Sequence, residues 1–356
     1  MKAAVISQGS ESSKWVADAL RKYFDKVEEI NLKGLEINIS GNHAEILYLG
    51  KKLENFDCIY AKGSFRYSQV LRTLTTILKD DCYMPITAEA FTVAHDKLLT
   101  HLMLQQYKIP MPKTYISTTI PAARELLSSM NYPIIMKFPQ GTQGKGVMFA
   151  DSYSSASSIL DALSALKQSF IIQEFVDTDN SDVRAIVVGD KVVAAMVRRG
   201  SSNEKRANIH AGAIGESYDL DQNTKDIAVK AAKATGAEIC GVDILESIRG
   251  PLVLETNVSP GLQGITKATK IDVADKIARY LYKETVNKKN KQQKIETKNV
   301  MSEVNNGGEL ITSLDYRGTR ILLPEIATLI SKITSQDQVE INVKKGIITL
   351  KKIDIN

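Results

Sequence analysis

Residues 242–261 are the stretch that most constrains how this chain can fold. Two apolar runs flank a Ser-Ile-Arg-Gly-Pro turn, which predicts a β-hairpin centred near Arg249. In that hairpin Asp243 lies opposite Glu255, and Asn257, two residues further on, shares their face. A register slip of two residues would keep all three side chains on one side of the sheet.

Two carboxylates that face each other across a ladder repel, so a cation is expected to compensate for them. Mg²⁺ prefers one or two carboxylates, an amide oxygen and phosphate oxygens. Asp243, Glu255 and Asn257 therefore predict a site for a metal and a nucleotide. The alternative is a surface hairpin whose acidic residues lie in water. The Asn-x-Ser-Pro-Gly exit at 257–261 and the alignment of three ligand-type residues favour the metal site.

Composition indicates an ordinary soluble globular protein of two or three domains, with 356 residues, 43% apolar and 24% charged. No run of about 18 apolar residues predicts a membrane span. Cys58, Cys82 and Cys240 are far apart and form no CxxC pattern, which favours reduced thiols in a cytoplasm over a structural zinc site. The net charge of +5 is too mild to indicate nucleic-acid binding by itself.

Four segments differ in their patterns. Residues 1–95 alternate strand and helix signals, which predicts an open α/β sheet without a dinucleotide fingerprint. Residues 96–284 carry the hairpin and further strands and helices. Residues 285–308 are rich in Lys, Asn, Gln and Glu and read as a flexible linker. Residues 309–356 become apolar again and predict a small appended domain with a hairpin around Lys344-Lys345-Gly346.

A glycine-rich turn, Gly141-Thr142-Gln143-Gly144-Lys145-Gly146, connects two strand signals. It is no P-loop, because Pro139 stands where the first Gly is needed and Gly146 follows the lysine. A plain turn is the simple alternative. A glycine flap could instead close over phosphates, whose charge Lys97 and Lys137 would neutralise. For each lysine alone, a solvated surface position is the alternative.

Two further segments suggest ligand contacts. Gln173-Glu174-Phe175-Val176 ends an apolar strand and could offer backbone groups to an adenine edge, or could simply run to the surface. A polar loop brings several basic and amide side chains close together: Arg198, Arg199, Arg206, Asn208 and His210. Clustered arginines are typical of carboxylate or phosphate recognition, and a solvated loop is the alternative.

The order of these motifs resembles the RimK-type α-L-glutamate ligases of the ATP-grasp superfamily, from residue 1 to about 284. The matching stretches are His95-Asp96-Lys97-Leu98, Lys137 with Gly141-Thr142-Gln143-Gly144 and Gly146, Gln173-Glu174-Phe175, Asp182-Val183-Arg184, Val187-Val188-Gly189-Asp190, Arg198-Arg199, Arg206-Ala207-Asn208-Ile209-His210, Gly241-Val242-Asp243-Ile244-Leu245, Arg249-Gly250-Pro251 and Glu255-x-Asn257-x-Ser259-Pro260-Gly261.

The resemblance implies an α/β protein with an ATP-grasp fold: a pre-ATP-grasp domain at 1–95, an ATP-grasp domain at 96–284 with its glycine-flap subdomain at about 110–175, and the appended β-rich domain. ATP would lie between the flap and the C-terminal subdomain. Phosphates would be held by Lys97, Lys137 and the flap glycines Gly144 and Gly146. Adenine and ribose would be held by Glu174, Phe175, Val176 and Asp182.

The resemblance also implies two Mg²⁺ or Mn²⁺ ions on Asp243, Glu255 and Asn257. Arg206 and Asn208 would act at the γ-phosphate and the reacting carboxylate. At His210-Ala211-Gly212-Ala213 the chain departs from the family, which often has Arg after the histidine, and this leaves acceptor recognition open. The tail from Glu309 has no counterpart there and is loosely similar to swapped-hairpin DNA-binding or dimerisation modules.

The implied activity is an ATP-dependent carboxylate–amine ligase that adds L-glutamate, or another amino acid, through an acyl phosphate. Three acceptor classes remain open: the C-terminal carboxylate of a protein, as in ribosomal protein modification; a glutamyl-tailed deazaflavin or pterin coenzyme; and an amino-group carrier protein. A nucleotide-sensing regulator that uses the C-terminal domain is the non-enzymatic alternative. The resemblance implies a homo-oligomer. The cysteines predict a cytoplasmic protein, and the lack of a long apolar run predicts no membrane partner.

Overall fold

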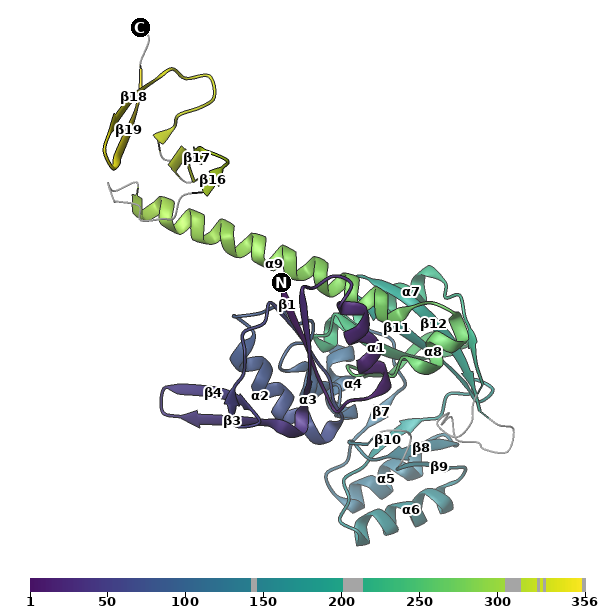
Figure 1. Ribbon diagram of the computed structural model, residues 1–356. Coiled ribbons are helices and arrows are strands. Elements are labelled where there is room, and N and C mark those ends of the chain that lie inside the picture. Colours follow the sequence, from purple (N-terminus) through teal and green to yellow (C-terminus); the bar gives the residue numbers. More distant parts are fainter. Residues whose placement is uncertain (142–145, 201–213, 305–314, 325–326, 329–330, 354–356) are drawn as a thin grey trace. The chain divides into compact units, whose positions relative to one another are not determined.

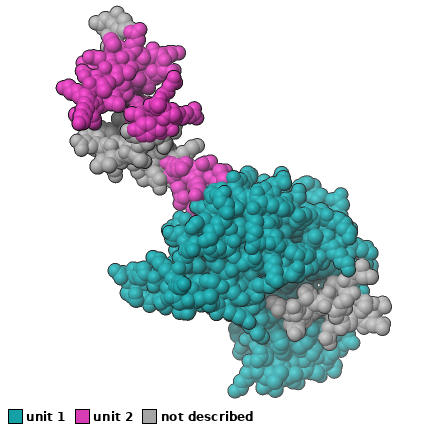
Figure 2. Space-filling model, in the orientation of Figure 1, with its two compact units in different colours: residues 1–285 teal, residues 286–356 magenta. Residues whose placement is uncertain are grey.

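The computed structural model describes residues 1–141, 146–200, 214–304, 315–324, 327–328 and 331–353. The chain divides into two compact units, residues 1–285 and 286–356, which Figure 2 colours separately. Among the described helices, none has the length and apolarity that a bilayer crossing requires.

A parallel sheet in the order β2-β1-β6 begins the first unit (Figure 1). It consists of β1 (Lys2–Ser7), β2 (Lys26–Asn31) and β6 (Cys58–Ala61). Its α/β character was predicted and is confirmed. The helices of this region are α1 (Glu11–Leu20), α2 (Ser68–Leu78), α3 (Ala90–Val93) and α4 (Lys97–Gln106), with 3₁₀ turns at Leu32–Gly34 and Phe65–Tyr67.

An antiparallel sheet in the order β3-β4-β5 lies between β2 and β6 in the sequence. It consists of β3 (Leu35–Ser40), β4 (His43–Tyr48) and β5 (Lys51–Lys52). Strand β3 was not predicted, although its alternating Leu-Glu-Ile-Asn-Ile pattern is itself typical of a half-buried strand.

The glycine-flap region forms its own layer, a four-stranded antiparallel sheet in the order β7-β10-β8-β9, with α5 and α6 packed against each other beside it (Figure 1). A separate apolar core fills this layer, including Leu127, Met136 and Leu160. The elements are β7 (Thr114–Tyr115), α5 (Ile120–Ser129), β8 (Ile134–Lys137), β9 (Val147–Ala150), α6 (Tyr153–Ala165) and β10 (Ile171–Glu174).

The largest sheet is antiparallel, in the order β13-β12-β11-β14-β15. Its central strand β11 is buried along nearly its whole length, as expected for a strand covered on both faces. The elements are β11 (Ser181–Val188), β12 (Lys191–Arg199), β13 (Ile214–Ser217), α7 (Gln222–Thr235), β14 (Ile239–Ser247), β15 (Gly250–Asn257) and α8 (Gln263–Thr269). Helix α7 packs on β14 and β15 and therefore fixes the hairpin that carries the predicted ligands.

Helix α9 runs from Val273 to Val304, so the lysine-rich stretch read as a flexible linker is helical through residue 304. Its Lys, Gln and Glu residues are good helix formers, and a helix can continue without an apolar stripe when its composition is favourable. The absence of apolar periodicity therefore did not exclude a helix.

The second unit contains two hairpins, β16–β17 and β18–β19. Their strands are β16 (Asp315–Arg317), β17 (Arg320–Leu322), β18 (Val339–Lys344) and β19 (Ile347–Lys352). The hairpin predicted around Lys344-Lys345-Gly346 is present, with Val343 paired to Ile348. This unit is β-rich, as the sequence predicted.

Candidate active site

The β14–β15 hairpin brings Asp243 directly opposite Glu255, as the sequence predicted. The hairpin reaches this pairing differently from the regular hairpin that the sequence predicted. The turn is tighter, because Ser247 pairs with Gly250, and a β-bulge follows between Asp243 and Ile244. Without the bulge, Asp243 would face Leu254 and Glu255 would point to the opposite side of the sheet. The bulge is thus what places both carboxylates on one face.

Beside Asp243 lie two buried arginines from the neighbouring strands. Arg184 on β11 forms a two-pronged ion pair with Asp243, with Nε–Oδ1 and Nη2–Oδ2 distances of 2.7 and 2.6 Å. Arg198 on β12 reaches the same carboxylate at 2.9 Å and also pairs with Asp182. Together with Glu255, these side chains form a row of two cations and three carboxylates across four strands of one sheet face.

The charges in this row shift one another. Burial alone would raise the pKa of Asp243, but the Arg184 and Arg198 charges outweigh it and hold this pKa well below its usual range. Burial and the Asp243 carboxylate raise the pKa of Glu255. Asp243 is therefore already neutralised within the protein, whereas Glu255 is the carboxylate that still needs a cation.

Glu255 makes no hydrogen bond or ion pair with any residue that the structure describes, and it lines a pocket. Asn257 lines the same pocket, and its Oδ1 accepts one hydrogen bond, from the Ser259 amide at 2.9 Å. Within the described ranges no group of three or more His, Cys, Asp or Glu side chains is arranged so that it could hold a metal ion by itself. The set of two carboxylates and one amide fits Mg²⁺, which keeps water and phosphate oxygens as further ligands.

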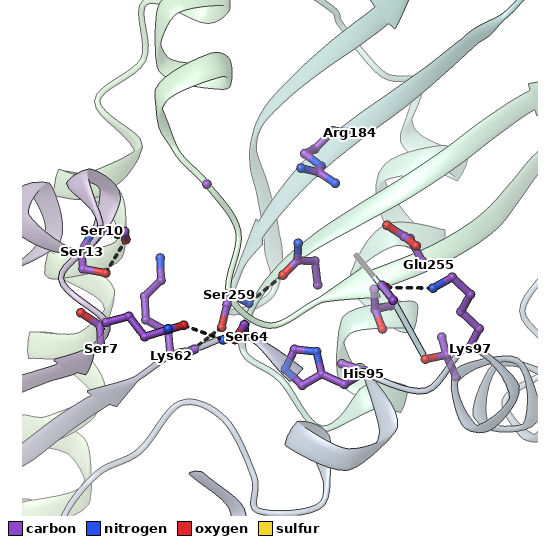
Figure 3. Close-up of a pocket in the computed structure, with 18 residues that line it drawn as sticks. Ser7, Ser10, Ser13, Lys62, Ser64, His95, Lys97, Arg184, Glu255 and Ser259 are labelled. Atoms are coloured by element: carbon purple, nitrogen blue, oxygen red, sulfur yellow. Dashed lines mark hydrogen bonds between the residues drawn. The ribbon is translucent and has the colours of Figure 1, made fainter. Parts of the chain in front are cut away.

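The pocket has a volume of about 470 Å³ and lies between the N-terminal sheet and the β14–β15 hairpin. In Figure 3, Lys62 and three serines gather at one side, and Glu255 and Lys97 at the other. The lining residues are Ser7, Gln8, Ser10, Ser13, Lys62, Gly63, Ser64, Ala94, His95, Lys97, Thr100, Gly141, Arg184, Glu255, Thr256, Asn257, Ser259 and Gly261.

Lys97 and Lys137 both lie at the base of the glycine flap. Lys97, the first residue of α4, donates to the Gly141 carbonyl at 3.1 Å and lines the pocket. Lys137 is 4% exposed and donates to Gln173 Oε1 at 2.8 Å. Burial lowers the pKa of Lys137 to about 8. Both cations are thus held by neutral oxygens, so their charge remains available to an anion.

Gly146 closes the described part of the flap at φ +80°, where a Cβ would lie 2.2 Å from the Phe138 ring. Its carbonyl accepts the Phe138 amide, which locks the base of the β8–β9 hairpin. Only glycine fits this position without displacing the ring. Gly144 lies outside the described residues.

The residues predicted to hold adenine and ribose lie in two places. At the end of β10, Glu174 pairs with Arg249 of the hairpin turn and accepts the Lys113 amide, both at 2.8 to 2.9 Å. Next to it Phe175 packs edge-on against Phe149, and Val176 is partly buried. Asp182 lies on β11, paired with Arg198, and does not line the pocket.

Several residues predicted to bind ligand lie in other elements than expected or outside the described residues. Arg198 and Arg199 belong to strand β12 and not to a loop, and Arg198 is committed to Asp182 and Asp243. Arg206, Asn208 and His210 lie outside the described residues. The sequence reading missed Arg184 as the partner of Asp243. The Asp-x-Arg spacing on a predicted strand, which puts both charges on one face, was the available signal.

His95 and Lys62 also went unassigned, and both line the pocket. The His95 Nε2 atom is buried without a hydrogen-bond partner, and burial together with Lys97 lowers its pKa to about 4. His95 is therefore neutral near pH 7 and can donate or accept a hydrogen bond, but it adds no charge. The motif His95-Asp96-Lys97-Leu98 was part of the family resemblance but gave His95 no role, because its place in the pocket depends on long-range packing.

The model of the RimK-like ATP-grasp domain matches residues 94–281. Among curated proteins, one relative is a probable alpha-L-glutamate ligase of Picosynechococcus, 35% identical over 291 residues, which cover 80% of this chain and 96% of the relative. Another, from Cellvibrio japonicus, bears the same name and is 35% identical over 286 residues, 79% of this chain and 95% of the relative.

Among solved structures, the fold is similar to the ATP-grasp ligase PsnB complexed with a phosphomimetic variant of its minimal precursor, Mg and ADP. The TM-score is 0.60 at 18% identity, and the match covers 80% of this chain and 98% of that one. At this identity the likeness concerns the fold.

Proposed function

The chain belongs to the RimK-like ATP-grasp family and is an ATP-grasp ligase, and from this premise we propose that it adds L-glutamate to the C-terminal carboxylate of a protein. The observation that carries the proposal is the pairing of Asp243 with Glu255 beside Asn257, at a pocket that Lys97 also lines. Glu255 has no partner among the described residues and shares the pocket with the cation Lys97. This arrangement suits the binding of a metal-bound triphosphate better than the binding of water alone.

In the proposed reaction, an oxygen of the acceptor carboxylate attacks the γ-phosphorus of ATP. The bond from that phosphorus to the β–γ bridging oxygen breaks, and ADP leaves. The glutamate amine then attacks the acyl phosphate carbonyl, loses a proton, and inorganic phosphate departs. Positioning and charge neutralisation contribute most to the first step, and Lys97 and Lys137 are placed at the flap base to provide both.

Two Mg²⁺ or Mn²⁺ ions would be held by Glu255 and Asn257, with Asp243 shared between a metal and Arg184. When bound, such ions neutralise phosphate charge. The protein's own contribution is to fix these oxygens on two paired strands and to surround them with the cations Arg184 and Lys97.

The remaining site residues complete the proposal. Glu174, Phe175 and Val176 would contact adenine at the end of β10, and Asp182 would contact ribose by sharing its carboxylate with Arg198. Gly144 and Gly146 would cover the phosphates. Arg206 and Asn208 would act at the γ-phosphate and the reacting carboxylate. Closure of the flap at 141–146 would exclude water that would hydrolyse an acyl phosphate.

A peptide acceptor is supported by the similar fold of PsnB, one of whose structures is complexed with a precursor peptide. We place the reaction in the cytoplasm, which suits three buried cysteines without a disulfide. We also propose that the protein assembles as a homo-oligomer, which light scattering would test.

Mass spectrometry tests the proposal directly. Purified protein, Mg-ATP, L-glutamate and a cell extract should give proteins heavier by whole glutamyl residues at their C-terminal ends, with ADP formed only when glutamate is present. The Glu255→Gln variant is the matched control and should give neither product. Glutamyl mass on a small molecule alone would replace the protein acceptor, and ADP formation indifferent to every amino acid would overturn the proposed reaction.

A further inference from the structure

Lys62 is a buried cation at the wall of the pocket. It follows β6, is 5% exposed, and its Nζ donates to the Pro260 carbonyl at 3.1 Å. No carboxylate among the residues that the structure describes pairs with it. Buried lysines are rare unless paired, because the charge loses its hydration. Burial lowers the pKa of Lys62 to about 8, so the side chain keeps most of its charge near pH 7.

Around Lys62, the described lining residues are rich in hydrogen-bond donors and include no acid. Ser7, Ser10 and Ser13 contribute hydroxyls to the same side of the pocket (Figure 3), and Ser10 caps the N-terminus of the ten-residue helix α1. Glu255, the one acidic residue among the described residues that line the pocket, lies at the other side with Lys97. The pocket therefore has a metal-binding side and a separate side suited to an anion.

A stable backbone holds Lys62 in this place. The Gly63 amide donates to Ser259 Oγ at 2.9 Å, and the Ser64 amide donates to Gln8 Oε1 at 3.3 Å. These contacts, with the Lys62–Pro260 bond, join the loop after β6 to the exit of the β14–β15 hairpin. The cation is thus fixed relative to Glu255 and Asn257, as a substrate-positioning group has to be.

We propose that Lys62, with the hydroxyls of Ser7 and Ser10, binds a carboxylate of the incoming amino acid that does not react. This inference rests on the proposed function. An amino acid that enters through its amine brings its own α-carboxylate, and glutamate brings a γ-carboxylate as well. Neither is consumed, and each has to be kept away from the phosphorylated centre. A cation on the side of the pocket remote from Glu255 does this, and it selects acidic or zwitterionic substrates over uncharged amines.

Titration calorimetry with L-glutamate tests the proposal, using the full chain with Mg²⁺ and a non-hydrolysable ATP analogue. Lys62→Met, which preserves the buried aliphatic stem, should weaken glutamate binding about 10- to 100-fold, the range for losing a hydrogen bond to a charged group. Lys62→Arg should keep most of the affinity. Lys51→Met on the exposed strand β5 is the matched control and should change nothing.

Two amide analogues identify the carboxylate. Isoglutamine lacks the α-carboxylate and glutamine lacks the γ-carboxylate. If Lys62 holds the α-carboxylate, isoglutamine should bind weakly to the unmodified protein, and Lys62→Met should not weaken that binding further. If Lys62 holds the γ-carboxylate, glutamine should behave in this way instead. Equal glutamate affinity in Lys62→Met and the unmodified protein overturns the inference while leaving the proposed function intact. A loss of nucleotide affinity in Lys62→Met also overturns it. Absence of amino-acid binding to the unmodified protein would instead overturn glutamate as donor.

Discussion

The β14–β15 and β18–β19 hairpins both pair β-branched residues across an antiparallel ladder, but their surroundings differ. Val253 on β15 is fully buried, whereas Val343 on β18 is 68% exposed. The first hairpin is covered by α7 and flanked by β11, whereas the second forms a two-stranded sheet with no further strand among the described residues. Local pattern therefore produces a hairpin in both places, and tertiary packing decides which one can hold side chains in fixed positions.

This difference explains why the proposed chemistry lies on β14–β15. A site needs oxygens that stay in place when charge develops. On β15, Glu255 is held beside Arg184 and Lys97 by pairing with β14, which is buried along most of its length. On β18, the apolar side chains Ile341 and Val343 are in water, and a two-stranded hairpin alone is only marginally stable.

The largest expected effect is a loss of activity that occurs for a change on β15 but not for the same change on β18. Glu255→Gln should lower ligation about 1,000-fold or more, because it removes a charge that a metal requires. Glu340→Gln, the same change on exposed β18, should leave the rate within twofold. Rates of ADP formation with saturating Mg-ATP measure both. Similar rates for the two variants would contradict the claim that the proposed chemistry lies on the β14–β15 hairpin.

Arg184→Met should have the next largest effect, this time on stability. It leaves Asp243 and Asp182 buried with only Arg198, and breaking a buried pair costs about 3–5 kcal/mol. Urea unfolding of the first unit measures the loss. Lys352→Gln, which breaks the ion pair with Asp337 in the second unit, should not shift that transition. Unchanged unfolding of Arg184→Met would mean that the charge row contributes little.

A matched pair of valines sharpens the packing argument. Val253→Ala should cost about 2 kcal/mol in the free energy of unfolding, from the lost burial and the cavity left behind. Val343→Ala should cost less than about 0.5 kcal/mol, because its side chain is already in water. Chemical denaturation gives both values, and a larger cost at Val343 would show that the β18–β19 face is covered in solution.

The smallest effect is expected from removing the second unit's hairpins. A chain that stops after Val304 keeps α9 complete and every residue of the pocket. Its kcat and KM for ATP should stay within about twofold of the full chain, since no group that binds nucleotide is lost. A large loss of activity would assign these hairpins a part in catalysis.

The sequence predicted most of the first unit because its strands and helices carry clear periodicity. It paired Asp243 with Glu255 across the hairpin that forms β14 and β15. It did not predict the bulge beside Asp243, since a bulge leaves no compositional mark. Nor did it predict that Arg198 would turn inward to Asp182, because that contact depends on strand pairing across 16 residues.

A crystal structure with Mg²⁺ and a non-hydrolysable ATP analogue tests the central claim most directly. The account predicts metal ions coordinated by Glu255 and Asn257 at about 2.0–2.1 Å, with the triphosphate reaching Lys97 beneath the glycine flap. Ions bound only by phosphate and water, with Glu255 turned away from them, would contradict the claim that the β14–β15 hairpin is the metal site.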